Sequence, residues 1–503
     1  MTEKQQGLYV FKNGEWQEIS SKEEAGDLPI ATEEQLGAVK IGKGLDIDKS
    51  GILSTKTASK EAIESGVSDD EFITPKGLSE SKEKIIKSVV DIEKYDKHLE
   101  KIASKDELGH FKVGRGLEIK EDGTLFIPEN KTYIYGVEID EENPDPFGAV
   151  TYIADSEGFE PLYTSDGNVE YGDWRNKFPI NKVIVVLMKE GKVIEELDKN
   201  DYTKTIDGRT VDITSGVSGD VMVAIPLTYW KFERVGSKLR IYISNRQVNS
   251  GFKAYAHSRN GVVQDDYLYV GAFKGTVKDG KLRSLHDVMS TGSNTISKFR
   301  EYAEANGEGY GQMNWATMTL MQIFTVLLTK SLDSQTTLGR GYVDDNDEYI
   351  KNGGTVDKGL FYGETTGKQH MKFLGIEDFW GNRYEWVDGL VRKDNKFWTN
   401  TNNRAYNDNA VGYVEAGVAP NFDDYFKTVT GTTESGFIPS ERGGSSSTYY
   451  CDYYWYNSGH RVVAFGGDRS LGSGSGAFRL DAYGSPAYAN ARRGARCLYL
   501  KQK

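Results

Sequence analysis

A repeat of 24 residues constrains this chain of 503 residues more than any other feature of its sequence. One copy, ATEEQLGAVKIGKGLDIDKSGILS, begins at Ala31, and the second, ASKDELGHFKVGRGLEIKEDGTLF, begins at Ala103. Each copy has two short strand-like runs separated by Gly-x-Gly-Leu and a closing Ser-Gly or Asp-Gly turn. A unit this short cannot bury a core alone, so it has to stack or pair with copies from other chains. The repeat therefore predicts a fibrous stalk.

A helical pattern lies between the two copies. Apolar residues over Leu78–Ala103 recur at alternating spacings of four and three, which predicts a helix with a narrow apolar seam. Ile85 and Ile92 fall at core d positions of the heptads, which disfavours a parallel dimer and favours three strands. The alternative is a single amphipathic helix packed on a neighbour, because Lys82 and Asp96 interrupt the seam.

The overall composition excludes several classes of partner. The formal net charge is −13, and the Lys and Arg residues are scattered among more numerous acids. Phosphate binding requires a concentrated basic face, so we expect no nucleic-acid partner. No stretch approaches the roughly 20 apolar residues of a membrane span, and the N-terminus lacks the features of a signal peptide. We therefore expect synthesis in the cytoplasm and no membrane insertion.

The chain is expected to contain four parts. Residues 1–30 form an attachment segment with a hairpin, because Leu8–Phe11 and Trp16–Ile19 flank an Asn-Gly turn. Residues 31–132 form the stalk, 133–210 a small β-rich connecting domain, and 211–503 an α+β head. The predicted helices of the head are Ser297–Asn306 and the almost wholly apolar Trp315–Thr329. Predicted strands include Lys182–Met188, Val221–Ile225, Leu239–Ser244 and Tyr267–Phe273.

Motifs along most of the chain resemble phage tail proteins. ITPKGL at Ile73–Leu78 and the two LGxxKxGxGL units resemble tail-fibre repeats. From Tyr135 onwards, the order of motifs is similar to that of a widespread family of phage tail proteins with a C-type-lectin-like fold, which formylglycine-generating enzymes and phage tropism determinants share. The motifs are YGVEID, AVTYIAD, DITSGVSGDVMVAIP, NSGFKAYAH, YLYVGAFKG, SQTTLGRGY, GIEDFWGNRYEWVDGL, GGSSSTYYCDYYWYNSGHRVVAFGG and GARCLYL.

The resemblance implies a fold class and a function. The fold class is mixed, with a fibrous β and coiled-coil trimeric stalk followed by an α+β C-type-lectin-like head. The function is a non-catalytic adhesin at the tip of a phage or phage-like tail, which recognises a host cell-surface polysaccharide or protein. It implies a homotrimer on the virion tail, attached to a tail baseplate or fibre protein through its N-terminus. The alternative is a tail-associated enzyme, either a polysaccharide depolymerase or an oxidase of the formylglycine-generating type.

The chain lacks the spacing patterns of several catalytic and metal sites. Its six histidines show no zinc-binding spacing, and neither a nucleophile elbow nor a phosphate-binding loop is present. The acidic run Asp344–Glu348 does not match a calcium-binding hand, so a solvated loop is favoured over an irregular calcium site. Cys451 does not stand where a partner cysteine of the oxidase is expected, and we interpret it and Cys497 as buried free thiols. We expect no catalytic residue, metal or cofactor.

Tyrosines close to the C-terminus favour a binding surface. Five of them lie between Tyr449 and Tyr456, among Gly, Ser and Asn, which is the mixture that antibody loops use. The alternative is a set of core strand residues, and we expect Tyr450, Tyr453 and Trp455 or their neighbours to be buried, together with Trp380 and Trp386. The predicted receptor-binding residues occupy three loops on one distal face. They are Tyr456, Asn457, His460, Asp468, Arg469, Ser470, Ser473, Asp481, Tyr483 and Tyr488.

Arg469 is the predicted hot spot of this surface, because arginine in a glycine-rich loop can bind a carboxylate or stack on a ring. Two alternatives remain open at this stage. Arg469 and Asp481 could pair with each other across adjacent loops and so be structural. The receptor could instead bind near Trp398–Asn403.

Overall fold

The computed structural model describes residues 132–401 and 404–502 in full and, before residue 132, only the backbone of seven short strands. The chain divides into two compact units, Met1–Lys131 and Thr132–Lys503. The predicted coiled coil over Leu78–Ala103 lies outside the described residues. The trimeric stalk therefore stays a prediction.

The first unit contains the hairpin predicted near the N-terminus. β1 (Leu8–Lys12) and β2 (Glu15–Ile19) pair in antiparallel fashion, with Lys12 opposite Glu15, so two residues separate the strands. β3 (Val39–Lys40) adds a third strand beside β1. The strong Asn-Gly signal is thus confirmed, because a two-residue connection fixes the register of both strands.

The described residues of the two repeat copies form equivalent strand pairs. In the first copy, β4 (Leu45–Ile47) pairs with β5 (Leu53–Thr55), and in the second, β6 (Glu118–Ile119) pairs with β7 (Leu125–Phe126). Ile47 lies opposite Leu53, and Ile119 lies opposite Leu125 at the equivalent positions. A pair of short strands therefore flanks the closing turn in both copies, whereas the run before Gly-x-Gly-Leu in the second copy lies outside the described residues.

A seven-stranded sheet with the order β14-β13-β12-β15-β20-β35-β23 forms one part of the second unit. All seven residues of β15 are buried, and its sequence, DVMVAIP, is apolar on both faces, as expected for a central strand. β35 comes from the C-terminal segment and lies between β20 and β23. The strands are β12 (Ile184–Lys189), β13 (Lys192–Asp198), β14 (Asp201–Thr205), β15 (Asp220–Pro226), β20 (Tyr267–Gly271), β23 (Tyr310–Gln312) and β35 (Cys497–Tyr499).

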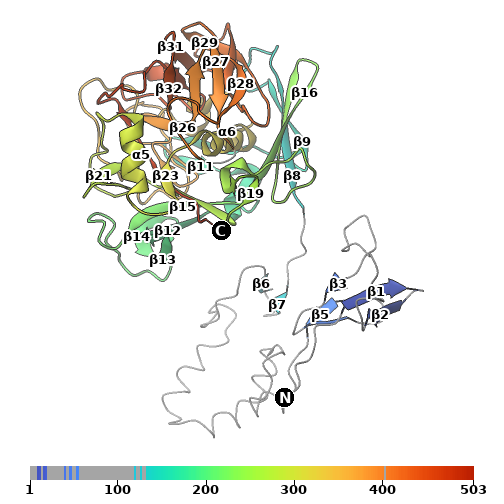
Figure 1. Ribbon diagram of the computed structural model, residues 1–503. Coiled ribbons are helices and arrows are strands. Elements are labelled where there is room, and N and C mark those ends of the chain that lie inside the picture. The colour runs from blue at the N-terminus through green and yellow to red at the C-terminus, as the bar shows by residue number, and fades with distance from the viewer. Residues whose placement is uncertain are drawn as a thin grey trace, which may run out of the picture. The chain divides into compact units, whose positions relative to one another are not determined.

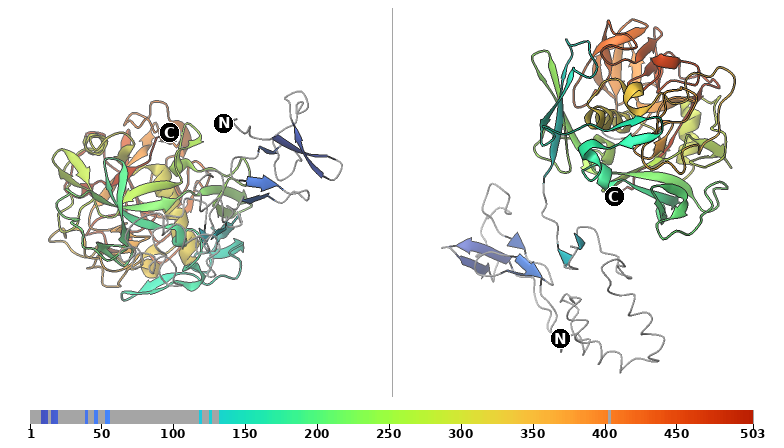
Figure 2. Two further views of the ribbon diagram at one scale, coloured as in Figure 1. Left: turned by 90° about the horizontal axis from the view of Figure 1, so that it is seen from below. Right: turned by 180° about the vertical axis from the view of Figure 1, so that it is seen from behind.

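A four-stranded sheet with the order β16-β17-β8-β9 lies along one side of this unit (Figure 2). Buried and partly exposed residues alternate along β16 and β17, which is the pattern of a sheet with one face on the core. The strands are β8 (Ile134–Asp140), β9 (Val150–Ala154), β16 (Tyr229–Val235) and β17 (Lys238–Ser244). Four strands were predicted from β-branched and apolar runs, and the structure confirms them as β12, β15, β17 and β20.

A nine-stranded sheet contains most of the C-terminal strands. Its order is β28-β27-β26-β32-β33-β31-β29-β30, and β34 pairs with β26 outside this path. The strands are β26 (Tyr384–Lys393), β27 (Lys396–Thr399), β28 (Val414–Val418), β29 (Asp424–Val429), β30 (Pro439–Arg442), β31 (Tyr453–Tyr456), β32 (Arg461–Phe465), β33 (Leu480–Ala482) and β34 (Arg493–Gly494). Four two-stranded pairs complete the second unit: β10 (Tyr163–Ser165) with β11 (Asn168–Glu170), β18 (Ser258–Arg259) with β19 (Val262–Val263), β21 (Thr276–Lys278) with β22 (Lys281–Arg283), and β24 (Lys372–Phe373) with β25 (Ile376–Glu377).

Helices are few in the described part of the chain. α5 (Ile296–Glu304) and α6 (Trp315–Thr329) confirm the two predicted helices, and the five-residue α7 (Ser334–Leu338) is too short for a periodic signal. All fifteen residues of α6 are buried, and the helix contacts both β8 and β26 (Figure 1). No helix among the described residues has the length and apolar character needed to cross a membrane.

One hydrophobic core joins all three large sheets to α6. It includes Val137 of β8, Val223 of β15, Phe324 of α6 and Phe465 of β32, each no more than 1% exposed. The segment 133–210 therefore contributes strands to the same sheets and core as the segment 211–503. The described chain is mostly β-sheet with few helices, and a C-type-lectin-like head stays a prediction.

The tyrosine-rich segment is buried at Tyr450 and at the neighbour of Tyr453 and Trp455, which agrees with the prediction. Tyr450 and Tyr454 are fully buried, whereas Tyr453 and Trp455 are only half-buried. Every second residue from Tyr450 through Asp452 to Tyr454 is buried, and the φ values of +59° and +58° at Tyr449 and Cys451 show that the chain turns before β31 begins. Trp380 and Trp386 are fully buried, as predicted. Cys451 and Cys497 are buried free thiols, also as predicted.

Candidate functional site

Three neighbouring strands, β31, β32 and β33, position the loops that were predicted to bind the receptor. β33 lies between β32 and β31, parallel to β31 and antiparallel to β32. In this register Tyr456 is opposite Ala482, whereas Phe465 is opposite Leu480. The loops 457–460 and 483–488 therefore leave the strands at one end, and the loop 468–475 leaves them at the other. The structure brings two of the three predicted loops together, and the third lies apart from them.

A row of aromatic rings, which we call the aromatic row, consists of Trp455, Tyr483 and Tyr488. The rings of Trp455 and Tyr483 are stacked with centroids 4.7 Å apart, and Tyr488 meets Tyr483 edge to face at 6.0 Å. All three side chains are half-buried, so each is fixed by packing and still presents part of its ring to solvent. Rigid rings of this kind give a large contact area at a low cost in conformational entropy.

A buried ion pair supports the aromatic row. Asp481 is fully buried and accepts hydrogen bonds from Arg493 Nη2 at 2.9 Å and from the Tyr483 backbone N–H at 3.0 Å. The Arg493 guanidinium lies 5.0 Å from the ring centroid of Tyr488 and 5.1 Å from that of Trp386. Asp481 was predicted to contact the receptor, but it is buried and instead supports the loop that carries Tyr483. Its partner is Arg493, and Arg469 takes no part in this pair.

The neighbouring loop 457–460 is fixed by backbone contacts. Asn457 donates its N–H to the Ala482 carbonyl at 3.1 Å, and its side chain accepts from Ser458 N at 2.8 Å. His460 Nε2 contacts the Asp408 carbonyl oxygen. The ring of Tyr456 stacks on buried Tyr454 at 6.2 Å, and all three of Tyr456, Asn457 and His460 are half-buried. These residues therefore form a polar border beside the aromatic row.

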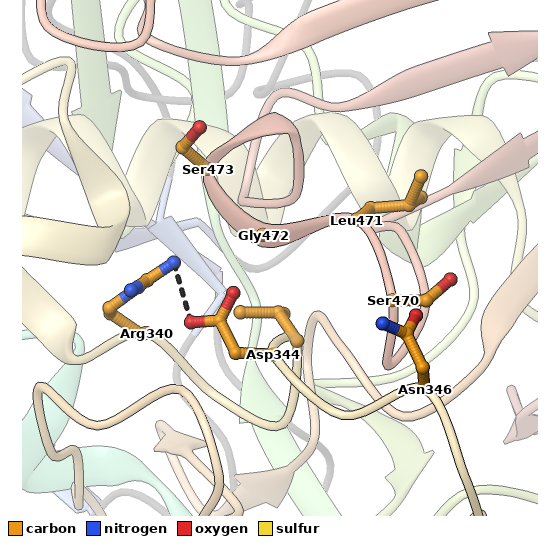
Figure 3. Close-up of a pocket in the computed structure, with 8 residues that line it drawn as sticks. Arg340, Asp344, Asn346, Ser470, Leu471, Gly472 and Ser473 are labelled. Carbon is orange, nitrogen blue, oxygen red and sulfur yellow. Dashed lines mark ion pairs between the residues drawn. The ribbon is translucent and has the colours of Figure 1, made fainter.

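The loop 468–475 lines a separate depression, which we call the loop hollow. It has a volume of about 460 Å³ and is lined by Arg340, Val343, Asp344, Asn346, Ser470, Leu471, Gly472 and Ser473. Figure 3 shows Arg340 and Asp344 facing each other, and their ion pair measures 2.7 Å from Nη2 to Oδ2. The predicted residues Ser470 and Ser473 belong to this hollow. Asp344 and Asn346 come from the acidic run considered as a calcium loop, whereas no sequence pattern pointed to Arg340.

Hydrogen bonds hold the two walls of the loop hollow together. Gly472 donates its N–H to the Val343 carbonyl at 3.0 Å, and Asp345 donates its N–H to the Arg469 carbonyl at 2.7 Å. Gln335 of α7 donates to the Gly472 carbonyl at 2.9 Å. The φ of Gly472 is +56°, a left-handed conformation in which a side chain is strained.

The two charged residues predicted in this loop mainly support it. Asp468 is 1% exposed, accepts from Ser470 N at 3.1 Å and lies 3.4 Å from Arg492 Nε. Arg469 is half-buried and donates from Nη1 to the Asp345 carbonyl at 2.9 Å. Its guanidinium lies 4.7 Å from the ring centroid of Tyr349. Arg469 therefore connects two loops of its own chain.

A buried group of His370, Glu377 and Asp378 is the one set of potential metal ligands found among the described residues. His370 Nδ1 lies 2.9 Å from Asp378 Oδ2 and 3.8 Å from Glu377 Oε1. Burial alone lowers the pKa of His370, but the charges of Asp378 and Glu377 outweigh it and raise the pKa to about 9. A protonated imidazole occupies the position that a metal ion needs. Glu377 also accepts from Gly353 N and Thr355 N, at 2.6 and 2.7 Å. The charged and polar atoms of this group are therefore paired with one another and with the backbone. The spacing of these residues in the sequence did not predict the group.

Comparison with known proteins gives little further information. No protein-family model matches the chain, and no curated protein matches it. Among solved structures, the chain is similar to one named Major Tropism Determinant P3c Variant, with 11% sequence identity, coverage of 79% of this chain and 84% of that chain, and a TM-score of 0.26. A similarity at this level carries no argument about function, so the residues of this chain have to supply it.

Proposed function

We propose that this protein is a non-catalytic adhesin of a phage or phage-like tail, and that it binds a host cell-surface receptor through the aromatic row. The observation that carries the proposal is the stack of half-buried Trp455, Tyr483 and Tyr488 above the buried Asp481–Arg493 pair. Rings held in this way lose little entropy on binding, and they suit both the apolar faces of sugars and protein epitopes. The phage-tail motifs of the sequence supply the biological setting.

The proposed receptor surface differs from the one expected from sequence. Tyr456, Asn457 and His460 border the aromatic row at the same end of the strands, so they remain candidate contacts. Trp455 joins them because its ring stacks directly on Tyr483. The loop hollow, with Ser470 and Ser473, is a separate and secondary candidate surface. Asp468, Arg469 and Asp481 are assigned to support of the loops.

Alanine substitution of single tyrosines tests this surface. In Tyr483→Ala or Tyr488→Ala, we expect about thirtyfold weaker binding of the labelled full chain to a susceptible bacterial strain, because a hot-spot ring contributes about 2 kcal/mol. Tyr163→Ala is the matched control, since Tyr163 is 40% exposed on β10, outside the aromatic row. Binding by both row variants at wild-type strength, with unchanged melting temperatures, would place the receptor surface elsewhere.

The proposal also includes the absence of catalysis. Purified capsule or cell-wall glycan incubated with the full chain is expected to release no new reducing ends, and no thiol substrate should be oxidised. An oxidase of the resembled type needs two cooperating cysteines, whereas Cys451 and Cys497 are separate, buried thiols. Product release by the pure protein would favour the enzyme alternative.

Assembly completes the proposed function. We propose a homotrimer with a C-type-lectin-like head, held together by residues 31–132 and attached to a baseplate or fibre protein through residues 1–30. The short hairpins β4–β5 and β6–β7 support this, because a pair of two or three residues per strand is not stable alone. Light scattering of the full chain at micromolar concentration should give three times the mass of one chain, and a monomer would contradict this arrangement.

A further inference from the structure

A second depression in the C-terminal unit, which we call the amide hollow, has a volume of about 410 Å³. Its walls come from the end of α5 and from β23, from the segment 404–406, and from residues 498–502. It shares no lining residue with the loop hollow and includes none of the aromatic row. Its size falls within the range of about 300–1,000 Å³ that is usual for small-ligand sites.

Gln312 lines the amide hollow with an acceptor that has no partner. This residue is 1% exposed, and its Nε2 donates to the Ile296 carbonyl at 2.9 Å and to Asp388 Oδ2 at 3.1 Å. Both partners are acceptors, so this end of the side-chain amide is the nitrogen and the other end is the oxygen. Its Oε1 is buried and has no hydrogen-bond partner in the described part of the chain. Buried polar atoms are nearly always paired, so this acceptor calls for a donor from outside the protein.

Asn314 lines the same hollow with a donor that has no partner. Its Oδ1 accepts from Thr317 N at 3.0 Å and from Thr317 Oγ1 at 3.1 Å, which makes it the N-cap of α6. The cap fixes the orientation of this amide as well. Its Nδ2 is buried and unpaired among the residues that the structure describes. The residues that line the hollow therefore include one unpaired acceptor and one unpaired donor whose orientations the fold has already set.

The charged groups that line the hollow balance in formal charge, because the three arginines Arg259, Arg300 and Arg404 stand against the three acids Glu304, Glu308 and Asp388. Arg300 Nε lies 3.0 and 3.1 Å from the two carboxylate oxygens of Asp388, and its Nη2 lies 2.7 Å from Asp408 Oδ1. Arg404 Nε donates to the Ser258 carbonyl at 3.2 Å. An anionic ligand would therefore compete with carboxylates in place, and a neutral ligand has no such cost.

We infer that the amide hollow binds one unit of a neutral saccharide. A hydroxyl group both donates and accepts, so a pair of neighbouring hydroxyls can donate to Gln312 Oε1 and accept from Asn314 Nδ2. Tyr406 also lines the hollow and supplies a ring for the apolar face of a sugar. This site is independent of the aromatic row, and it gives the protein a second, recessed contact with glycan.

Methyl glycosides of glucose, galactose, mannose and N-acetylglucosamine are suitable probes, with glucuronate as the anionic comparison. Saturation-transfer NMR on the full chain should show binding of at least one neutral glycoside, with a dissociation constant of about 1 mM. Asn314→Ser keeps an oxygen that can cap α6 and removes Nδ2, so it should weaken binding about tenfold with little change in melting temperature. Asn346→Ser, the same change in the loop hollow, is the matched control and should leave the affinity unaltered.

Tyr406→Leu provides a second variant that does not touch the helix cap, and it should also weaken glycoside binding. The inference is overturned if no neutral glycoside binds at about 10 mM, if glucuronate binds in preference, or if both variants bind like the wild type. Tyr483→Ala separates this site from the proposed receptor surface, since it should impair cell binding and retain glycoside binding. The cell-binding assay therefore tests the aromatic row, and the glycoside-binding assay tests the amide hollow.

Discussion

Replacement of Glu385 by glutamine should destabilise the C-terminal unit by about 3–5 kcal/mol. Glu385 lies on β26 and is fully buried, and its carboxylate accepts from Lys274 Nζ at 2.9 Å and from Arg496 Nη2 at 2.6 Å. Burial opposes the charge, but Arg496 and Lys274 lower the pKa of Glu385 below its usual range, so the group stays ionised. Glutamine has nearly the same shape as glutamate, so the substitution creates no cavity. It leaves the buried cations Lys274 and Arg496 without their counter-charge, and this loss accounts for the whole destabilisation.

Urea unfolding of the full chain followed by tryptophan fluorescence measures this effect, because seven of the eight tryptophans lie beyond residue 132. Glu301→Gln is the matched control. Glu301 pairs with Lys298 at 2.7 Å, but the two side chains are 63% and 47% exposed, so the loss should be below about 1 kcal/mol. If Glu385→Gln unfolds within about 1 kcal/mol of the wild type at an unchanged denaturant slope, the reasoning about buried counter-charges is wrong.

Three further variants test other parts of the structure. Cys451→Ala with Cys497→Ala should lower the free energy of unfolding by about 1–3 kcal/mol and leave cell binding intact, and weaker binding at an unchanged melting temperature would contradict this. Gly472→Ala should cost about 1 kcal/mol in thermal unfolding, because the φ of +56° is strained for alanine; an unaltered melting temperature would argue against that strain. His370, whose pKa is raised from 6.5 to about 9, contributes stability that is complete below pH 6.5 and is lost as the pH rises through 9. The stability advantage of the wild type over His370→Gln should therefore fall by up to about 3 kcal/mol across that window in urea titrations, and a constant difference would refute it. Lys372, whose pKa burial lowers to about 7, is common to both proteins and cancels in the comparison.

Local signals in the sequence were sufficient for part of the fold. The hairpin β1–β2 followed from two strand-like runs around an Asn-Gly pair, and its register needs no distant contact. α6 followed from fifteen residues that are apolar almost all round, and Asn314 caps it just before Trp315. β15 and β17 followed from runs of β-branched residues. In each case the pattern and its structural consequence lie within one stretch of chain.

The arrangement of the candidate site depends on contacts between distant segments. β33 pairs with β31 on one side and with β32 on the other, and only this order reveals that the loop 468–475 leaves the strands at the end opposite to the other two loops. Asp481 could pair with any arginine that packing brings near it, and the structure selects Arg493. Tyr450 and Tyr454 are buried on the core side, whereas Tyr453 and Trp455 keep part of their surface exposed, and the sequence did not decide between these two sets. Trp455 was expected among the buried residues and not in the receptor surface, and no sequence pattern pointed to Arg340.

The position of β35 in the middle of a sheet has a consequence for biosynthesis. Residues 497–499 separate β20 from β23, so this sheet cannot close until residue 499 has been translated and has left the ribosome. Until then the backbone groups of Val270 and Gly311 that pair with Leu498 lack their partner strand. Chains terminated before residue 497 therefore lack the strand that joins β20 to β23. Such products expose unpaired strand edges that proteases and chaperones recognise.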